Sequence, residues 1–331
     1  MMISVCVITY NHAKYISQCL DSVLMQQTNF DYEVLVGEDD SSDGTREICK
    51  EYAAKNPDKI RLFLNDRKNV IYIDRRPTGR WNFINLLSST KGKYIALCEG
   101  DDYWTDPYKL QKQVDFLDAH PDFAICFHWT RWLDEESGQI MHRKYGPPFI
   151  KPYYTIDDLL EHSNFIPTCS VMSRNGLLSE FPDWYFKSGI GDFPLHIMNA
   201  QHGKIGFIDE TMAVYRRHKE GGHGSQNLSQ NLKRLVDSYT LIGVNMHLDK
   251  RASYRIGVSK WNIELSRAYM SEGKVIKAFL AVYDAFKIAP NNQKVPTFFR
   301  LIYTLIPNYL KGLIHESISI LKHKGLKVFL A

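Results

Sequence analysis

Short apolar runs alternate with amphipathic segments through the first half of the chain. Unbroken apolar runs are typical of buried strands, whereas apolar residues three and four positions apart are typical of helices. The expected strands lie at 3–9, 32–37, 60–64 and 94–98, and the expected helices at 12–27, 45–54 and 82–89. Strands this apolar, separated by helices, predict an α/β fold in which helices cover a mostly parallel sheet on both faces.

The second half of the chain is less regular, and its pattern changes near residue 225. The expected helices lie at 109–118 and 192–201, and the expected strands at 123–129, 168–172, 205–208 and 212–216. From 226 onward the pattern is helical, and 264–292 has the spacing of one helical hairpin, which we expect to pack on the body rather than to form a partner-binding array. We therefore predict a domain at 1–225 and a helical region at 226–331.

Polar residues follow three of the expected strands, at the point where each strand ends. TYN follows the first strand, GEDDSSDGT the second and EGDD the fourth. The carboxyl ends of parallel strands meet at one edge of a sheet, and ligands of such sheets bind there. Three polar strand ends therefore predict a binding site at this edge.

The stretch ALCEGDDYW at 96–104 places Glu99, Asp101 and Asp102 directly after the fourth strand. Two unit charges about 5 Å apart repel by roughly 3 kcal/mol at an effective dielectric near 20, so a compensating positive charge or a raised pKa is expected. Glu99 and Asp101 are two positions apart, which turns both side chains to one face of an extended segment. Magnesium and manganese prefer such oxygen ligands. The alternative is an acidic loop that caps the helix near Pro107.

The stretch GEDDSSDGT offers two carboxylates with different expected roles. Asp43 precedes the helix at 45–54, and we predict that it is the N-cap. Asp39 lies at a strand end, where a carboxylate can accept the N3 proton of a uracil ring. Thymine presents the same proton. Neither GxGxxG nor GxxxxGK[ST] is present in the chain, which excludes the dinucleotide fingerprint and the P-loop. The phosphates of a bound nucleotide would therefore need a divalent metal held by EGDD.

Composition and charge fit a folded protein in a reducing compartment. Apolar residues at 44% and charged residues at 24% are ordinary values. The six cysteines are dispersed in apolar surroundings without zinc spacing, which predicts buried free thiols and a cytoplasmic protein. We expect neither a secretory signal nor a membrane-spanning run. Residues 245–331 carry 14 Lys or Arg and 5 Asp or Glu, whereas the preceding residues carry 27 and 32, so the tail is basic.

The motifs TYN, EDDSSDGT and KGKYIALCEGDDYW, in this order, resemble a family 2 glycosyltransferase with the GT-A nucleotide-diphospho-sugar fold. The resemblance covers residues 1 to 225 and implies a mixed, mostly parallel sheet between helices. It places the nucleotide contacts of the first strand on Thr9 and Tyr10, and the uracil-contacting aspartate on Asp39. The metal motif, usually Asp-x-Asp, falls on 99–101, so the resemblance implies Asp101 as the firmer ligand of Mn²⁺ or Mg²⁺, supported by Glu99 and Asp102.

The resemblance also implies roles for three residues of the second half. The general base of the family lies at a helix start, where SGIGDFPLHIM supplies Asp192; as a structural residue, Asp192 would be the N-cap of that helix. The loop YRRHKEGGHGS resembles one that closes over the diphosphate. It supplies His218 as a candidate metal ligand and Arg217 as a candidate phosphate contact, and its glycines suit a lid. A histidine in such a loop can also be merely solvated.

The implied reaction is a single in-line displacement that inverts the anomeric carbon. Asp192 takes the proton of an acceptor hydroxyl, and a nucleoside diphosphate leaves from the opposite face. The expected donor is a nucleotide sugar, by preference a UDP-sugar, and the expected acceptor is a glycan or lipid-linked glycan of surface polysaccharide or lipopolysaccharide synthesis. The alternatives are a non-catalytic nucleotide-sugar-binding module and a metal-dependent nucleotidyltransferase. Nucleic acid is not an expected partner. The basic stretch 298–329 suits either peripheral attachment to the cytoplasmic face of the membrane or packing on the body.

Overall fold

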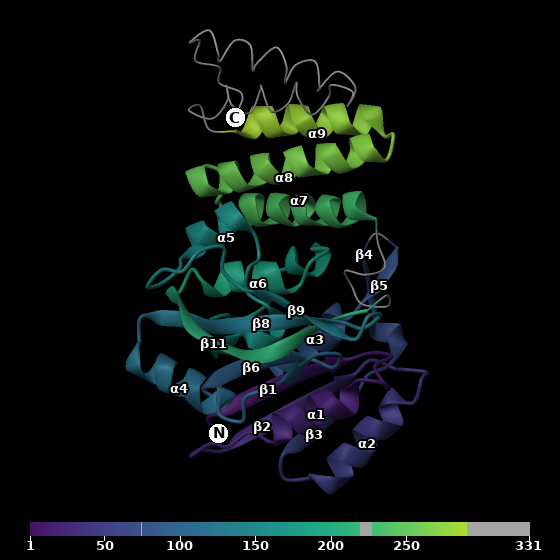
Figure 1. The fold of residues 1–331 in the computed structure, drawn as a ribbon, viewed down its shortest axis with the longest axis vertical. Helices are drawn as coiled ribbons and strands as arrows, with labels where there is room; N and C mark the ends of the chain where they lie inside the picture. Colours follow the sequence, from purple (N-terminus) through teal and green to yellow (C-terminus); the bar gives the residue numbers. More distant parts are fainter. Residues whose placement is uncertain (74, 219–226, 290–331) are drawn as a thin grey trace. The chain divides into compact units, whose positions relative to one another are not determined.

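The structure is a computed structural model that describes residues 1–73, 75–218 and 227–289. The chain divides into two compact units, Met1–Ser225 and Gln226–Ala331, and each unit is described here by itself. The first unit contains a large sheet between helices, and the described residues of the second unit form helices (Figure 1).

Four parallel strands form one half of the large sheet. They are β1 (Ile3–Thr9), β2 (Tyr32–Glu38), β3 (Ile60–Leu64) and β6 (Tyr94–Glu99), in the spatial order β3-β2-β1-β6. Nearly every residue of β1 and β2 is buried, as expected for parallel strands covered on both faces. The pairings confirm the parallel arrangement predicted from the first half of the chain.

The other half of the sheet is mixed. Its strands are β7 (Tyr103–Trp104), β8 (Phe123–Asp134), β9 (Gln139–Tyr145), β10 (Met172–Arg174) and β11 (Lys204–Arg217). β10 runs antiparallel to β6 and β8, whereas β11 runs parallel to β8 and antiparallel to β7. β9 pairs antiparallel with β8. A small separate sheet pairs β4 (Ile71–Ile73) with β5 (Arg76–Thr78).

Two predictions for the second half were wrong in detail. The strand expected at 168–172 is a 3-10 turn, Thr168–Ser170, followed by the short strand β10. The two strands expected at 205–208 and 212–216 are one strand, β11, with irregular register between Ile208 and Ala213. The stretch 131–165, which shows no clear period, contains the end of β8, β9 and the helix α5 (Ile156–His162).

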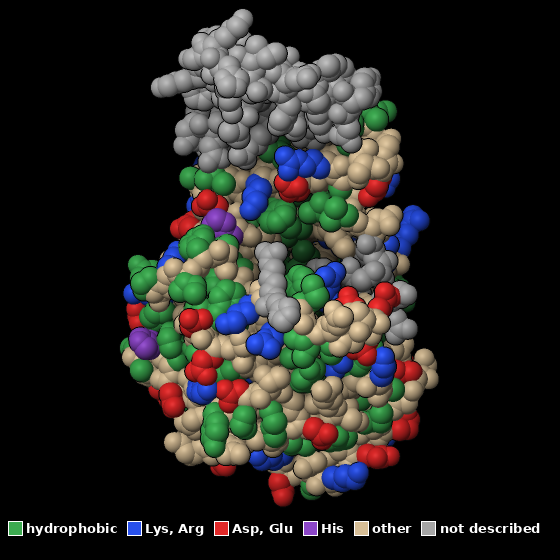
Figure 2. All heavy atoms as spheres, viewed as in Figure 1, with side chains coloured by type: hydrophobic (Ala, Val, Ile, Leu, Met, Phe, Trp, Pro, Cys, Tyr) green, Lys and Arg blue, Asp and Glu red, His purple; other side chains and the backbone are tan. Residues whose placement is uncertain are grey.

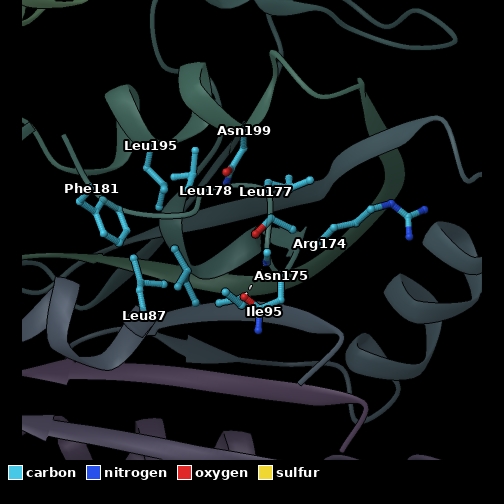
Figure 3. A pocket seen from close by; sticks show the side chains of 12 residues that line it. Leu87, Ile95, Arg174, Asn175, Leu177, Leu178, Phe181, Leu195 and Asn199 are labelled. Atoms are coloured by element: carbon cyan, nitrogen blue, oxygen red, sulfur yellow. Dashed lines mark hydrogen bonds between the residues drawn. The ribbon is translucent and has the colours of Figure 1, made fainter. Parts of the chain in front are cut away.

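Helices cover both faces of the parallel half. They are α1 (Ile16–Leu24), α2 (Thr45–Lys55), α3 (Arg80–Ser88), α4 (Lys109–Ala119) and α6 (Asp192–Asn199). Successive side chains of β6 point to opposite faces of the sheet, as in any strand. Ala96 and Cys98 lie in one hydrophobic core with residues of α1 and α4. Leu97 lines a pocket on the other face with Leu87 of α3 and Leu195 of α6 (Figure 3).

The second unit contains α7 (Leu228–Asn245), α8 (Ala252–Ser271) and α9 (Val275–Ile288). Gly273 has a φ of +72° in the turn that joins α8 to α9, and Ser259 donates a hydrogen bond to the carbonyl of Ala285 across the pair. The predicted helical hairpin is thus confirmed for residues 264–289. The basic stretch 298–329 lies outside the described residues.

Two further expectations can be compared with the structure. All six cysteines are buried free thiols, as predicted. Within the described ranges, no helix is long and apolar enough to cross a membrane. On the face of the first unit in Figure 2, acidic and basic side chains are interspersed.

Candidate active site

The carboxyl ends of β1, β2 and β6 meet at one edge of the sheet. Thr9, the last residue of β1, pairs in register with Glu38, the last residue of β2, and Ile8 pairs with Glu99, the last residue of β6. The three polar segments that follow these strands therefore begin at the same level along the strand direction. This confirms that TYN, GEDDSSDGT and EGDD lie together.

The acidic turn, which we define as residues 99–102, is packed against the end of β1. The amide of Gly100 donates to the carbonyl of Ile8 at 2.8 Å, and the amide of Asp102 donates to the carbonyl of Glu99 at 3.0 Å. A Cβ at position 100 would lie 2.6 Å from Thr9 Oγ1 and 3.0 Å from His12 Nδ1. Gly100 is therefore required for this close approach.

Asp101 contacts two histidines that come from distant segments of the chain. His218 Nε2 lies 3.0 Å from Asp101 Oδ2, and His12 Nε2 lies 3.9 Å from the same oxygen. Burial acts to raise the pKa of Asp101, but the hydrogen bond with His218 and the charges of His12 and His218 hold this pKa below its ordinary value. The sequence-based interpretation named His218 and missed His12, although His12 follows the TYN motif directly.

Asp102 is held by the backbone of β11. Its Oδ1 accepts a hydrogen bond from the amide of Arg216 at 2.8 Å, and its side chain is almost fully buried. Burial, together with the charges of Asp101 and Glu99, raises the pKa of Asp102 well above its ordinary value. Burial and the charges of Asp101 and Asp192 raise the pKa of Glu99 to about 8. Mutual repulsion in the acidic turn, expected from the sequence, is therefore present.

The acidic turn has the donor set that a divalent cation requires. Among the described residues, Asp101 Oδ1, Asp102 Oδ2 and His218 Nδ1 are buried without a hydrogen-bond partner. One ligand atom from each of Glu99, Asp101 and Asp102 lies within 4.8 Å of the others, and the same holds for His12, Asp101 and His218. Buried carboxylate oxygens without partners are costly unless a cation or proton binds them, and these ligands suit Mn²⁺ or Mg²⁺.

Arg216, rather than Arg217, contacts the acidic turn. Its Nε donates to the carbonyl of Asp101 at 2.7 Å, and its two terminal nitrogens contact Glu135 at 3.0 Å and Gln18 at 2.6 Å. Arg217 is exposed, and its guanidinium lies 4.8 Å from the centre of the Trp132 ring. Because side chains alternate along a strand, Arg216 faces the turn and Arg217 faces away from it. The structure thus does not bring Arg217 to the site.

Asp192 is the first residue of α6 and is held by neighbouring polar groups. Asn164 Nδ2 and Thr168 Oγ1 lie 2.7 Å and 3.4 Å from its Oδ2, and the amide of Phe193 donates to Oδ1 at 2.7 Å. The N-cap of α6 is Gly191, so the structural role considered for Asp192 in the sequence was wrong. The charge of Asp192 contributes to the raised pKa of Glu99, so the two carboxylates interact electrostatically.

The loop before Asp192 is fixed by a buried arginine that the sequence did not single out. Arg80 Nη2 donates to the carbonyl of Ser188 at 2.8 Å, and Nη1 donates to that of Tyr185 at 3.3 Å. Its guanidinium lies 4.5 Å from the centre of the Tyr185 ring. The Tyr185 hydroxyl donates to the carbonyl of Gly191 at 2.9 Å. These contacts connect α3 to the residue preceding Asp192.

A second group, at the ends of β1 and β2, combines Tyr10, Asp39 and Arg67. Asp39 is buried, and its amide donates to the carbonyl of Thr9 at 3.1 Å. Burial raises the pKa of Asp39 despite the charge of Arg67, whose Nη1 lies 3.3 Å from Asp39 Oδ2. The Arg67 guanidinium lies 4.3 Å from the centre of the exposed Tyr10 ring. Arg67 follows β3 in a short polar stretch without a distinctive motif, and the sequence did not identify it.

Asp43 lies one residue before the N-cap of α2, which is Gly44, whose φ of +101° is suited to glycine. The predicted N-cap position was therefore wrong, but the predicted hydrogen bond to a first-turn amide is present, because Asp43 accepts the amide of Thr45 at 3.0 Å. Asp43 also accepts the amide of Ala13 at 2.9 Å, which ties the segment after β1 to the start of α2. The expected glycine-rich lid beyond His218 lies outside the described residues.

Comparison with known proteins identifies one family. The sequence profile described as glycosyl transferase family 2 matches residues 4–179, about half of the chain. An uncharacterized protein of Mycobacterium tuberculosis is 39% identical over 225 residues, which are 66% of this chain and 59% of that protein. The chain therefore spans less than two thirds of the length of this relative.

Two solved structures have a similar fold at low sequence identity. TarS 1–349 of S. aureus in complex with UDP has a TM-score of 0.59 and 18% identity, over 96% of this chain and 87% of that one. A mannosyltransferase of Pyrobaculum calidifontis, in complex with GDP-Man and Mn²⁺, has a TM-score of 0.56 and 17% identity, over 93% of this chain and 81% of that one. The likeness confirms the GT-A-type mixed α/β fold.

Proposed function

The chain belongs to glycosyl transferase family 2, and from this premise we propose that its first unit, 1–225, transfers a sugar from a nucleoside-diphosphate donor to a hydroxyl acceptor with inversion. The observation that carries the proposal is the acidic turn, whose buried carboxylate oxygens lie at the edge where three parallel strands end. A divalent cation held there by Asp101, with Glu99, Asp102 and His218, would balance the negative charge of a departing diphosphate.

Asp192 is the proposed general base. Its Oδ2 is oriented by Asn164 and Thr168, and its carboxylate interacts electrostatically with Glu99 of the acidic turn, where the proposed reaction takes place. In this role Asp192 accepts the proton of the acceptor hydroxyl as that oxygen attacks the anomeric carbon. Attack from the face opposite the diphosphate inverts the configuration at that carbon.

The proposed nucleotide contacts are Thr9, Tyr10 and Asp39. Tyr10 presents an exposed ring, and the buried carboxylate of Asp39 can accept the imide proton of uracil. The complex of TarS with UDP supports a UDP-sugar, and the mannosyltransferase complex with GDP-Man and Mn²⁺ supports a nucleotide sugar with a metal. The phosphate contact expected of Arg217 has no support from the contacts of its side chain, which lies over the Trp132 ring.

The proposed biological role is synthesis of surface polysaccharide or lipopolysaccharide on a glycan or lipid-linked acceptor at the cytoplasmic face of the membrane. Residues 298–329 would provide peripheral contact with anionic lipid. Deletion of 297–331 should release the protein from membrane fractions, and unchanged partitioning would contradict this contact.

The central test is donor turnover by the purified chain. A thermal-shift screen of nucleotide sugars with and without Mn²⁺ selects the donor, and release of the nucleoside diphosphate then measures turnover. Asp101→Asn should abolish the Mn²⁺-dependent release, whereas Asp122→Asn, at an exposed position, should leave it unchanged. NMR of the transferred sugar reports inversion.

Other outcomes would favour the alternatives. Donor binding without turnover would favour a non-catalytic binding module. Release of pyrophosphate would indicate a nucleotidyltransferase. No donor binding with or without Mn²⁺ would contradict the proposed function.

A further inference from the structure

The segment that follows β1 contributes a second imidazole to the acidic turn. His12 lies three residues beyond Thr9, and its Nε2 is 3.9 Å from Asp101 Oδ2. The ring centres of His12 and His218 are 6.2 Å apart, and the rings are nearly perpendicular. Asp101 Oδ2 is thus approached by two imidazole nitrogens that belong to segments more than 200 residues apart.

We propose that His12 is a ligand of the divalent cation and that the set His12, Asp101 and His218 makes the site selective for Mn²⁺ or a similar transition ion over Mg²⁺. The proposal rests on the cation site of the proposed function, and it adds a ligand and a selectivity to that site. Imidazole nitrogen suits first-row transition metals, whereas Mg²⁺ prefers oxygen ligands and retains several waters.

The distances match those of ligands that share one ion. Two ligand atoms about 2.1 Å from a cation are separated by about 3.0 Å at a right angle and by about 4.2 Å when they are opposite. The 3.0 Å and 3.9 Å separations from Asp101 Oδ2 fall within these limits. The candidate atoms of His12 and His218 also lie within 4.8 Å of each other.

The second ring nitrogen of His12, Nδ1, has a hydrogen-bond partner, as in most metal-binding histidines. Its Nδ1 lies 3.3 Å from Thr9 Oγ1, so the tautomer with a proton on Nδ1 can donate to Thr9 and present Nε2 to the ion. Gly100 permits this approach, because a Cβ there would lie 3.0 Å from His12 Nδ1 and 2.6 Å from Thr9 Oγ1. The missing side chain at position 100 and the position of His12 are therefore coupled.

The competing arrangement is an all-oxygen set of Glu99, Asp101 and Asp102, which would suit Mg²⁺ as well as Mn²⁺. In that set, Asp102 already uses Oδ1 to accept the amide of Arg216 and is almost fully buried, which leaves one oxygen for an ion. Asp101 belongs to both sets. A substitution at His12 therefore separates the two arrangements, whereas a substitution at Asp101 does not.

The test measures binding of Mn²⁺ alone to the full chain, by the loss of the EPR signal of free Mn²⁺, with Mg²⁺ as a competitor. His12→Asn should weaken Mn²⁺ binding at least tenfold and leave Mg²⁺ binding within about twofold. Electron spin-echo spectra of bound Mn²⁺ should show two coupled imidazole nitrogens in the native chain and one in His12→Asn. His202→Asn, at an exposed histidine, is the matched control and should change neither result.

His12→Asp guards against a merely structural effect, because it keeps a ligand while removing the imidazole. It should retain cation binding and shift the preference toward Mg²⁺. Unchanged Mn²⁺ affinity and two imidazole nitrogens in His12→Asn would overturn the proposal, even if the native chain turns over a nucleotide sugar. Conversely, loss of one nitrogen in His12→Asn would support it even if no nucleotide sugar were turned over, so the two proposals fail separately.

Discussion

Replacement of Arg80 by methionine tests whether the loop before Asp192 must be held rigidly. Methionine retains most of the aliphatic volume but removes the guanidinium. The variant loses both hydrogen bonds to the carbonyls of Ser188 and Tyr185 and the contact with the Tyr185 ring. Since Tyr185 in turn bonds the carbonyl of Gly191, the loosened segment ends directly before Asp192.

The contacts of Arg80 allow an estimate of how much Arg80→Met lowers the free energy of unfolding and the rate. A hydrogen bond from a charged donor contributes about 1.5 kcal/mol at the lower end of its range, and a desolvated cation–ring contact adds about 1 kcal/mol. Removing the buried charge recovers part of its desolvation cost, so the net loss is about 3 kcal/mol. For a unit of this size, 1 kcal/mol corresponds to about 2–4 °C, which gives a fall in Tm of about 6–12 °C. Misplacement of a base by about 1 Å costs about a hundredfold in rate.

The assay compares Tm and kcat for sugar transfer in Arg80→Met and Arg174→Met. Arg174, in β10, also donates to backbone carbonyls, at 2.7, 2.6 and 3.0 Å, but these belong to Phe123, Leu117 and His120 and not to the loop before Asp192. Both variants should lose stability, and only Arg80→Met should lose kcat when assayed well below its Tm. Equal kcat in the two variants would refute the reasoning.

Three other substitutions address the base, a buried cation and a close approach of backbones. Asp192→Asn should lower kcat by about a thousandfold while Mn²⁺ binding remains detectable by EPR, because it removes the proposed proton acceptor and no proposed ligand. Burial lowers the pKa of Lys109 from 10.5 to about 8, so between these pH values the unfolded state binds more protons than the folded state. The free energy of unfolding of the native chain, measured with urea, should therefore rise by up to about 3 kcal/mol relative to that of Lys109→Met as the pH rises from 8 to 10.5. Gly92→Ala would place a Cβ 2.4 Å from the amide nitrogen of Ser4, so its free energy of unfolding in urea should fall by about 3 kcal/mol. The control is Gly79→Ala, whose Cβ would meet open space and whose free energy of unfolding should fall by less than about 1 kcal/mol.

The parallel half of the sheet was predictable because its strands are buried on both faces. Such strands require unbroken apolar runs, and the expected ranges 3–9 and 60–64 match β1 and β3. β11 was not predictable in the same way. Its register is irregular between Ile208 and Ala213, where Asp209 and Glu210 are exposed, so the sequence resembles two strands with a turn. A bulge tolerates polar residues that an ordinary buried strand would exclude.

The position of His12 could not be predicted from local pattern. The apolar spacing of 12–27 indicates one long helix, but α1 begins at Ile16. Asn11 adopts a left-handed conformation with a φ of +53°, its amide donates to Ser41 Oγ at 2.9 Å, and its Oδ1 accepts the amide of Ser42 at 3.0 Å. These contacts cross 30 residues of sequence. They replace the first helical turn with a bend that carries His12 to Asp101.

The role of Arg216 follows from strand parity, which depends on the full length of β11. A strand expected to end at 216 leaves Arg217 in the following loop, where it could face a phosphate. In the structure β11 continues to Arg217, so alternation places Arg216 toward the acidic turn and Arg217 toward Trp132. One additional strand residue is enough to fix which arginine contacts the site.

Arg216 is the positive charge that the crowded carboxylates require, but it does not neutralise them directly. Its Nε binds the main-chain oxygen of Asp101, and its terminal nitrogens bind Glu135 and Gln18. Its side chain therefore fixes the backbone of the turn and leaves the oxygens of Asp101 and Asp102 without a guanidinium partner among the described residues. A direct bidentate pair would have satisfied those oxygens and blocked a cation. Indirect support keeps the turn in place while leaving these carboxylate oxygens open to a ligand.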